Sequence, residues 1–312
     1  MMRFGLALLA LLAGNAILGA GLLAAHRATL DYAPWETDSL LLTMPRETLV
    51  DTVVLGTSHA YYLSRSHYNH ALTEAALGET VNLALPAGGG VRPASYYLAE
   101  FYARGNEAKR LVYLIEPFVF FSSGPNDAHK FVYFEPFNVR FAARLAADGY
   151  PARRLFTYLR SKFTWHWWAQ TAAPLGREAR RLGADDVDAM RIAQRIESLY
   201  TEGLSPAAFA RYRPYLGRIL ALANAHGTTV YLASPPTLLG HEPGQAQLVH
   251  ALEQLAGEYA FTYRDFTDAM PAPRWYYNLD HLNSVGMAHF LERFLAPYLA
   301  APGAHTTLKE RI

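Results

Sequence analysis

Five short apolar segments, separated by stretches with helical patterning, constrain the fold of this chain more than any other feature. They are residues 51–56, 80–85, 110–117, 228–236 and 260–266. Each run is continuous rather than alternating, which is typical of parallel strands buried on both faces. Helices are expected at residues 60–77, 93–103, 205–225, 245–259 and 285–299. We therefore predict an α/β domain with a three-layer, doubly wound parallel sheet, whose functional groups gather where the strands end.

The chain begins with an uncharged apolar run. Residues 4–25 read FGLALLALLAGNAILGAGLLAA. At about 1.5 Å per residue, a helix of this length covers the roughly 30 Å core of a bilayer. The run is longer than the apolar part of a cleaved signal peptide, and no clean A-x-A site follows it. We predict an uncleaved signal anchor over residues 1–27, a single transmembrane helix with its N-terminus in the cytoplasm.

The remaining chain is expected to form a connector, one large domain and a tail. The juxtamembrane connector is assigned to residues 28–47, the α/β domain to 48–300 and the tail to 301–312. Within the domain, residues from about 118 to 226 separate the third strand from the fourth. Connections of that length are usually functional insertions. We expect this one to be a helical cap over the sheet edge or a docking element.

Composition limits the chemistry. The chain has no cysteine, which excludes disulfides, thiolate catalysis and cysteine metal sites. With 28 basic and 27 acidic residues the net charge is +1, so no nucleic-acid partner is predicted. His67, His70 and Glu74 have the spacing of metal ligands, but they lack a further clustered carboxylate. We predict neither a metal nor a cofactor.

The first predicted strand ends in the sequence GTSH, residues 56–59. Ser58 follows the strand directly and precedes a helix, so its hydroxyl is expected at the carboxyl edge of the sheet. Free N–H groups at a helix N-terminus stabilise developing negative charge there. Taken alone, such a serine is more often a helix N-cap than a nucleophile. The adjacent His59 has two interpretations, a side chain that points into the site or an ordinary residue of the first helical turn, and we favour the second.

A nucleophilic serine needs a base, and one histidine has a distinctive context. Residues 275–290 read WYYNLDHLNSVGMAHF, in which Asp280 directly precedes His281. If the strand assignment holds, this segment lies at the same sheet edge as the serine. An adjacent acid can hold an imidazole and stabilise the imidazolium. The alternative is a loop with capping residues, Asn283 or Ser284, before the last helix.

The two segments together resemble the SGNH (GDSL-like) hydrolase superfamily. The sequence GTSHA is similar to the first motif of that family, with Thr57 where many members carry aspartate. The Gly-Thr-Ser variant is similar to the membrane-anchored O-acetyltransferases of alginate acetylation. The layout also resembles the D-alanyl transfer protein of teichoic acid synthesis. The resemblance implies a flavodoxin-like, SGNH-type sheet in a periplasmic domain, anchored by one helix in the inner membrane of a bacterium.

Carried over to this sequence, the resemblance implies roles for particular residues. Ser58 would be the nucleophile and an oxyanion donor through its backbone N–H, and His281 would be the general base. A second oxyanion donor would be the N–H of Gly88 or Gly89, in the glycine run after the second strand.

The sequence departs from the family pattern at two further positions. Glu116 and Pro117 follow the third strand, where the family places an asparagine donor, and Asn126 is the nearest candidate to fold back. Asn278 stands where the usual acid lies, three residues before the histidine. Either Asp280 orients His281 by another geometry, or the site is a Ser-His dyad assisted by Asn278.

The resemblance implies acyl transfer, with acetyl as the expected group, or ester hydrolysis on a cell-envelope or secreted polysaccharide. It also implies a multispanning membrane O-acyltransferase as partner. The alternative is a non-catalytic, membrane-anchored scaffold or accessory protein of a complex that assembles or modifies such a polysaccharide. The missing asparagine and the displaced acid favour this alternative.

Overall fold

The protein is an α/β protein built on one parallel sheet. The computed structural model describes residues 2–28, 30, 32–33, 41–85, 89–127, 132, 135–164 and 181–301. The strands are β1 (Leu49–Gly56), β2 (Thr80–Asn82), β3 (Glu107–Leu114), β4 (Thr229–Ser234) and β5 (Thr262–Asp265). They pair in parallel in the order β2-β1-β3-β4-β5. The predicted class and parallel sheet are confirmed, and all five predicted strands form.

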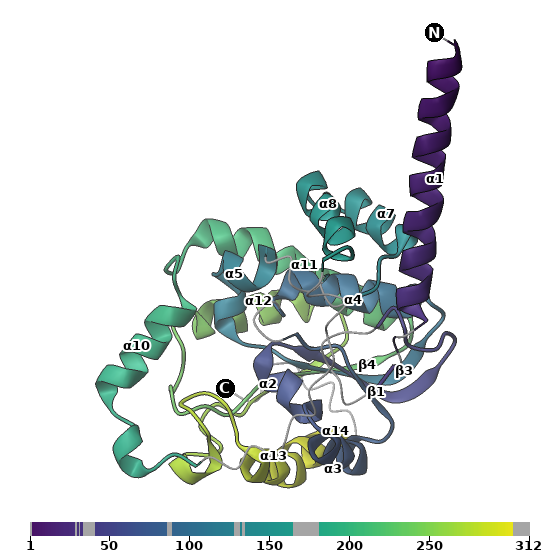
Figure 1. Ribbon diagram of the computed structural model, residues 1–312. Coiled ribbons are helices and arrows are strands. Elements are labelled where there is room, and N and C mark those ends of the chain that lie inside the picture. The colour runs from purple at the N-terminus through teal and green to yellow at the C-terminus, as the bar shows by residue number, and fades with distance from the viewer. Residues whose placement is uncertain are drawn as a thin grey trace.

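Helices cover both faces of the sheet (Figure 1). One face carries α4 (Val91–Ala103), α11 (Pro206–Ala225) and α12 (Gln245–Leu255). The other carries α3 (His67–Leu77), α13 (Ser284–Phe290) and α14 (Ala296–Ala300). Each face has its own apolar core. Val53 and Leu55 of β1 pack in the core beneath α4, α11 and α12, and Val54 between them packs in the core beneath α3, α13 and α14. Since neighbouring strand residues point to opposite faces, the continuous apolar runs follow from burial on both sides.

Two of the expected helices are interrupted. The predicted helix 60–77 consists of α2 (Ser58–Tyr61), a 3₁₀ turn (Tyr62–Ser64) and α3. Its break is explained by Ser66, whose side chain accepts a hydrogen bond from the Asn69 N–H and so starts a new helix. The last helix contains a π segment, Leu291–Leu295, between α13 and α14.

Several short helices lie between β3 and α11. They are a 3₁₀ turn (Pro117–Phe120), α5 (Ser123–Asp127), α7 (Val139–Ala147), α8 (Ala152–Ser161), a 3₁₀ turn (Ala184–Asp186) and α10 (Ala189–Leu199). A further 3₁₀ turn, Pro273–Trp275, precedes α13. The expected insertion at 118–226 includes α11, which packs on α4 over the sheet. The elements outside the sheet layers therefore end before α11.

The N-terminal helix α1 (Met2–Arg27) projects away from the domain (Figure 1). Its segment Phe4–Ala25 is long and apolar enough to cross a membrane, and none of its most apolar stretch is buried in the protein. This agrees with the predicted anchor in length and composition. The base of the helix is tied to the domain, because Arg27 Nη2 donates to the Leu42 carbonyl at 3.2 Å.

Candidate active site

The turn after β1 places Ser58 at the carboxyl end of the sheet. Gly56 has a φ of +146°, and a Cβ there would lie 2.7 Å from the Leu114 carbonyl oxygen, so the turn requires glycine. Thr57 is the N-cap residue of α2, and Ser58 is the first residue of the helix. The N-cap interpretation of Ser58 is therefore wrong. Its hydroxyl is instead hydrogen bonded to His281, with 2.6 Å between Oγ and Nε2.

His281 lies in a folded loop between β5 and α13. Tyr276 forms an isolated antiparallel bridge with Leu282, and the Tyr277 N–H donates to the His281 carbonyl at 3.0 Å. Asn283 ends the loop as the N-cap of α13, because its Oδ1 accepts from the N–H groups of the next helical turn. The anticipated cap is thus present, and it fixes the loop that carries the histidine.

Two acceptors face the other ring nitrogen of His281. Asn278 Oδ1 lies 3.1 Å from Nδ1 with hydrogen-bond geometry, and it also accepts from the His281 backbone N–H at 2.7 Å. Asp280 Oδ1 lies 3.2 Å from Nδ1, but it has no hydrogen-bond partner among the described residues. Because both groups that face Nδ1 among the described residues are acceptors, we assign the proton to Nδ1, which leaves Nε2 free to accept the Ser58 proton. Asn278 therefore orients the ring, while Asp280 supplies the negative charge.

The Asp280 carboxylate is nearly inaccessible and is paired with an arginine. Its Oδ2 accepts from Arg195 Nε at 3.0 Å and from Nη2 at 2.5 Å. Burial alone would raise the pKa of Asp280, but His281, His59 and Arg195 together hold that pKa well below its usual range. Arg195 comes from α10, 85 residues away in sequence. No motif in the sequence marked it.

His59 does lie in the first turn of α2, but its side chain points into the site, which was the less favoured of its two interpretations. Its ring stacks on His281, with centroids 4.5 Å apart and planes within 4°. Its Nδ1 lies 2.5 Å from Glu116 Oε1, and its Nε2 contacts the Asp280 carbonyl oxygen. Burial alone would lower the pKa of His59, but the Glu116 carboxylate raises it to about 9. His59 is therefore an imidazolium at neutral pH.

This stacked charge acts on His281. Burial and the neighbouring His59 charge lower the pKa of His281, while Asp280 and Glu116 oppose part of that effect. The imidazole of His281 is therefore neutral at neutral pH, the form in which it can accept a proton. Ser58 and His281 thus form a hydroxyl–imidazole pair with an ionised carboxylate beside it.

Glu116 occupies the position where the resemblance implies an asparagine donor. Its Oε2 accepts from the Thr57 hydroxyl at 2.5 Å, and its Oε1 faces His59. Asn126 folds back, but its Nδ2 donates to the Ser122 carbonyl at 2.9 Å and also to the Val119 carbonyl. Neither residue offers an amide proton toward Ser58.

Gly89 brings the loop after β2 against the serine turn. A Cβ on Gly89 would lie 2.5 Å from the Gly56 carbonyl oxygen and 3.1 Å from the Thr57 Cα. The backbone there can approach so closely only because residue 89 is glycine. Gly88, the other predicted oxyanion donor, lies outside the described residues.

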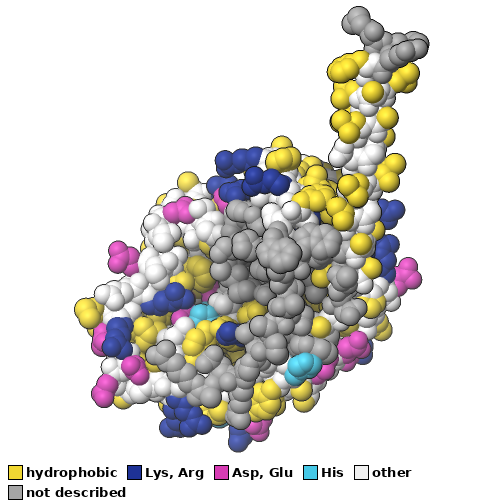
Figure 2. Space-filling model, viewed as in Figure 1, with side chains coloured by type: hydrophobic (Ala, Val, Ile, Leu, Met, Phe, Trp, Pro, Cys, Tyr) yellow, Lys and Arg dark blue, Asp and Glu magenta, His cyan; other side chains and the backbone are white. Residues whose placement is uncertain are grey.

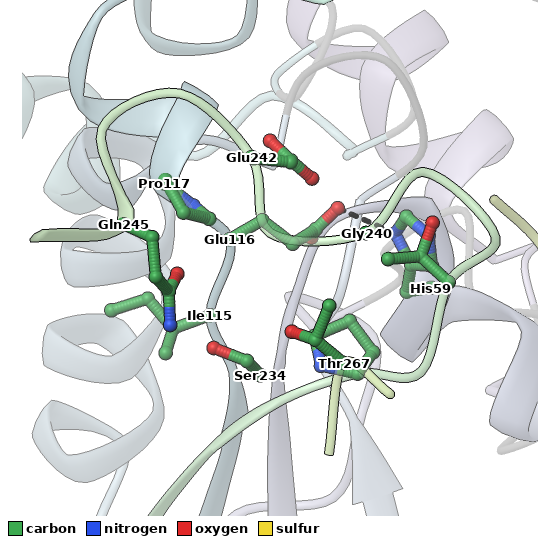
Figure 3. A pocket seen from close by; sticks show the side chains of 11 residues that line it. His59, Ile115, Glu116, Pro117, Ser234, Gly240, Glu242, Gln245 and Thr267 are labelled. Carbon is green, nitrogen blue, oxygen red and sulfur yellow. Dashed lines mark ion pairs between the residues drawn. The ribbon is translucent and has the colours of Figure 1, made fainter. Parts of the chain in front are cut away.

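His59 and Glu116 also line a small pocket (Figure 3). It lies beyond the ends of β3, β4 and β5, and its polar lining includes Ser234, Thr237, Glu242, Gln245 and Thr267. Burial and the nearby Glu116 raise the pKa of Glu242 to about 7. The pocket is therefore polar and acidic.

Among the residues that the structure describes, one trio of side chains is close enough to hold a cation. His59, Asp280 and His281 each offer an atom within 4.8 Å of the others. Both ring nitrogens of each histidine already have polar contacts inside the protein. A metal would also face the imidazolium of His59, so we assign this trio to proton chemistry.

The chain matches no protein-family model and no curated protein.

Proposed function

We propose that the protein is a serine acyltransferase or esterase. The observation that supports this most strongly is the 2.6 Å contact between Ser58 Oγ and His281 Nε2, made by segments 223 residues apart. In the first half-reaction, Ser58 Oγ attacks the acyl carbonyl and its proton moves to His281 Nε2. The tetrahedral intermediate then collapses, and the leaving alcohol takes that proton. The second half-reaction repeats these steps with an acceptor hydroxyl or water.

The oxyanion would be stabilised by backbone N–H groups. Ser58 lies at the N-terminus of α2, where helix N–H groups have no partner in the preceding turn. Gly89 is assigned as the second donor because its backbone lies against the same turn. Such donors are typically worth about 3–4 kcal/mol of barrier each.

Asn278 and Asp280 divide the role of a single triad acid. Asn278 fixes the ring by accepting from Nδ1, and Asp280 stabilises the imidazolium that forms during attack. Arg195 keeps Asp280 ionised and in place. Together they would take the place of the acid that the family carries three residues before the histidine, where this chain has Asn278.

The strand order β2-β1-β3-β4-β5 supports the kinship with SGNH-type proteins. It is the order of flavodoxin-like, doubly wound sheets, whose ligands bind near the carboxyl ends of the central strands. By that resemblance, the acyl group is acetyl and the acceptor is a hydroxyl of a cell-envelope or secreted polysaccharide. The helix α1 would hold the domain on the periplasmic side of the inner membrane, beside a multispanning O-acyltransferase.

One observation favours a second candidate, a non-catalytic scaffold of the same complex. Neither Glu116 nor Asn126 supplies the third oxyanion donor that the family uses. In that case the fold would be retained for docking and Ser58 would be unreactive.

Hydrolysis of a chromogenic acetate by the full chain in detergent tests the proposal. We expect Ser58→Ala and His281→Ala to abolish the activity. His250→Ala, on the exposed surface of α12, should leave it unchanged as the matched histidine control. Activity that survives both site substitutions would refute the assignment. Since a transferase can exclude water, a fluorophosphonate probe should be tested alongside, and its failure to label Ser58 would favour the scaffold.

A further inference from the structure

The helices α7 and α8 form an unusually basic pair beside α1. Five arginines and no acidic residue occur within them: Arg140, Arg144, Arg153, Arg154 and Arg160. Figure 2 shows basic side chains gathered at the top of the domain, on the side from which α1 leaves. Arg144 is paired with Glu100, whereas Arg140, Arg153 and Arg160 are exposed.

Exposed aromatic side chains alternate with these arginines. Arg153, Phe156, Arg160 and Phe163 recur at three- and four-residue spacing, so they share one face of α8 and the turn after it. We call these four residues the Arg-Phe stripe. Phe156 is 64% exposed and Phe163 is 48% exposed, whereas Tyr158 on the opposite side is buried. Exposing two phenylalanines to water is unfavourable unless another phase or molecule covers them.

The position of the Arg-Phe stripe along the axis of α1 indicates what covers the stripe. A Cβ on Gly19 of α1 would lie 3.9 Å from the Phe163 ring. Gly19 precedes Ala25, the end of the apolar span, by six residues, or about 9 Å along the helix axis. When α1 crosses a bilayer, Phe163 therefore lies at a level within the apolar span. Amphipathic interfacial helices typically bury their apolar face by about 5–10 Å.

The stripe and the base of α1 are held in one unit. Glu135, just before α7, accepts from the N–H groups of Leu41 and Leu42 at 2.9 Å each. Leu42 also accepts from Arg27 at the end of α1. The Tyr158 hydroxyl of α8 donates to the Pro136 carbonyl at 2.5 Å. The depth of the stripe therefore follows from the position of α1.

We propose that α7 and α8 form a second membrane contact that binds anionic phospholipid. The guanidinium groups of Arg140, Arg153 and Arg160 pair with headgroup phosphates, and Phe156 and Phe163 lie at the boundary of the acyl chains. The contact fixes the orientation of the domain on the membrane. It depends on α1 crossing the bilayer, but not on the chemistry of Ser58.

The absence of cysteine makes the test direct, because single cysteines can be introduced without removing others. Phe156→Cys in the full chain is labelled with an environment-sensitive fluorophore and reconstituted in nanodiscs that contain acyl-chain nitroxide quenchers. Met190→Cys is the matched control, since Met190 is 66% exposed on α10, away from α1 (Figure 1). Nanodiscs of phosphatidylcholine are compared with nanodiscs that also contain phosphatidylglycerol.

At position 156 we expect a blue shift and loss of about half the fluorescence, since the label should lie within the interfacial depth. Position 190 should show neither change. Phosphatidylglycerol should increase the quenching at 156, and Arg153→Glu with Arg160→Glu should remove that increase without changing acetate hydrolysis or the melting temperature. A label at 156 that is no better quenched than at 190 would overturn the membrane contact. Quenching at position 156 that is the same with and without phosphatidylglycerol would overturn the recognition of anionic lipid.

Discussion

The stacked pair of histidines gives the sharpest prediction: replacing His59 by glutamine should raise the pKa of His281. At neutral pH the His59 imidazolium lies 4.5 Å from the ring it opposes, measured between centroids. Two unit charges at that distance repel by about 1 kcal/mol in water and by about 4 kcal/mol at an effective dielectric constant of about 20. Since one pKa unit is about 1.4 kcal/mol, the expected increase is about 1–3 units.

The sign of this shift does not depend on how Glu116 responds. If Glu116 stays ionised without His59, its negative charge also favours protonated His281. If Glu116 becomes neutral, its own effect on His281 is also lost, but that effect is smaller than the effect of the His59 charge, so the shift stays upward. The double variant His59→Gln with Glu116→Gln is the matched control, because it removes both opposing charges. Its shift should be upward but smaller than the shift in His59→Gln with Glu116 ionised.

Imidazole NMR provides the assay, and it requires no substrate. The chain has 12 histidines, so the His281 signal is assigned by its loss in His281→Asn. Titration of the full chain in detergent then gives the pKa of His281 in each variant. Where acetate hydrolysis is measurable, the acid limb of the pH profile of kcat/KM should move to higher pH in the same variants. A His281 pKa that stays unchanged or falls in His59→Gln would refute the proposed electrostatic role of the stack.

Three further predictions concern stability and the oxyanion turn. Arg195→Ala should lower the free energy of unfolding by about 3 kcal/mol at neutral pH, since it leaves the buried Asp280 charge without its guanidinium; thermal melts check this. Gly89→Ala should abolish acetate hydrolysis and lower the melting temperature, because a Cβ would collide with the Gly56 and Leu85 carbonyl oxygens; unchanged hydrolysis would exclude this loop from the site. The folded-state pKa of His59 is about 9 against an ordinary value near 6.5, so its contribution of about 3 kcal/mol is complete below pH 6.5 and is lost as pH rises through 9. The free energies of unfolding of wild type and His59→Gln, measured by chemical denaturation across this pH range, should therefore converge at high pH.

The sequence predicted the sheet well because the information is local. Five apolar runs correspond to five strands, since strands buried on both faces need apolar side chains at every position. The second run continues to residue 85, but β2 ends at Asn82, although Leu83 and Leu85 still donate to β1 carbonyls. The break between α2 and α3 depended on Ser66 as a cap, and a periodicity argument does not weigh such competition.

The sequence predicted the part of the candidate site that depends on where the strands end, because residues that follow parallel strands meet at one edge of the sheet. Ser58 and His281 were expected at one sheet edge, and the structure brings them into contact. Arg195 had no sequence signal, because its position depends on how α10 packs over the edge. The sequence did not decide between the two interpretations of His59 for a related reason: the partner that makes it an imidazolium, Glu116, follows a different strand. Such tertiary charge pairs leave no periodic pattern in the sequence.

The most direct test of the central claim is the mass of the chain after reaction with a fluorophosphonate. We predict one adduct, located on the peptide that contains Ser58, absent in Ser58→Ala and strongly slowed in His281→Asn. Slowing is expected because the hydroxyl needs the neutral imidazole as its base. An adduct on another residue, or labelling of Ser58 that proceeds equally fast without His281, would contradict the assignment of this pair.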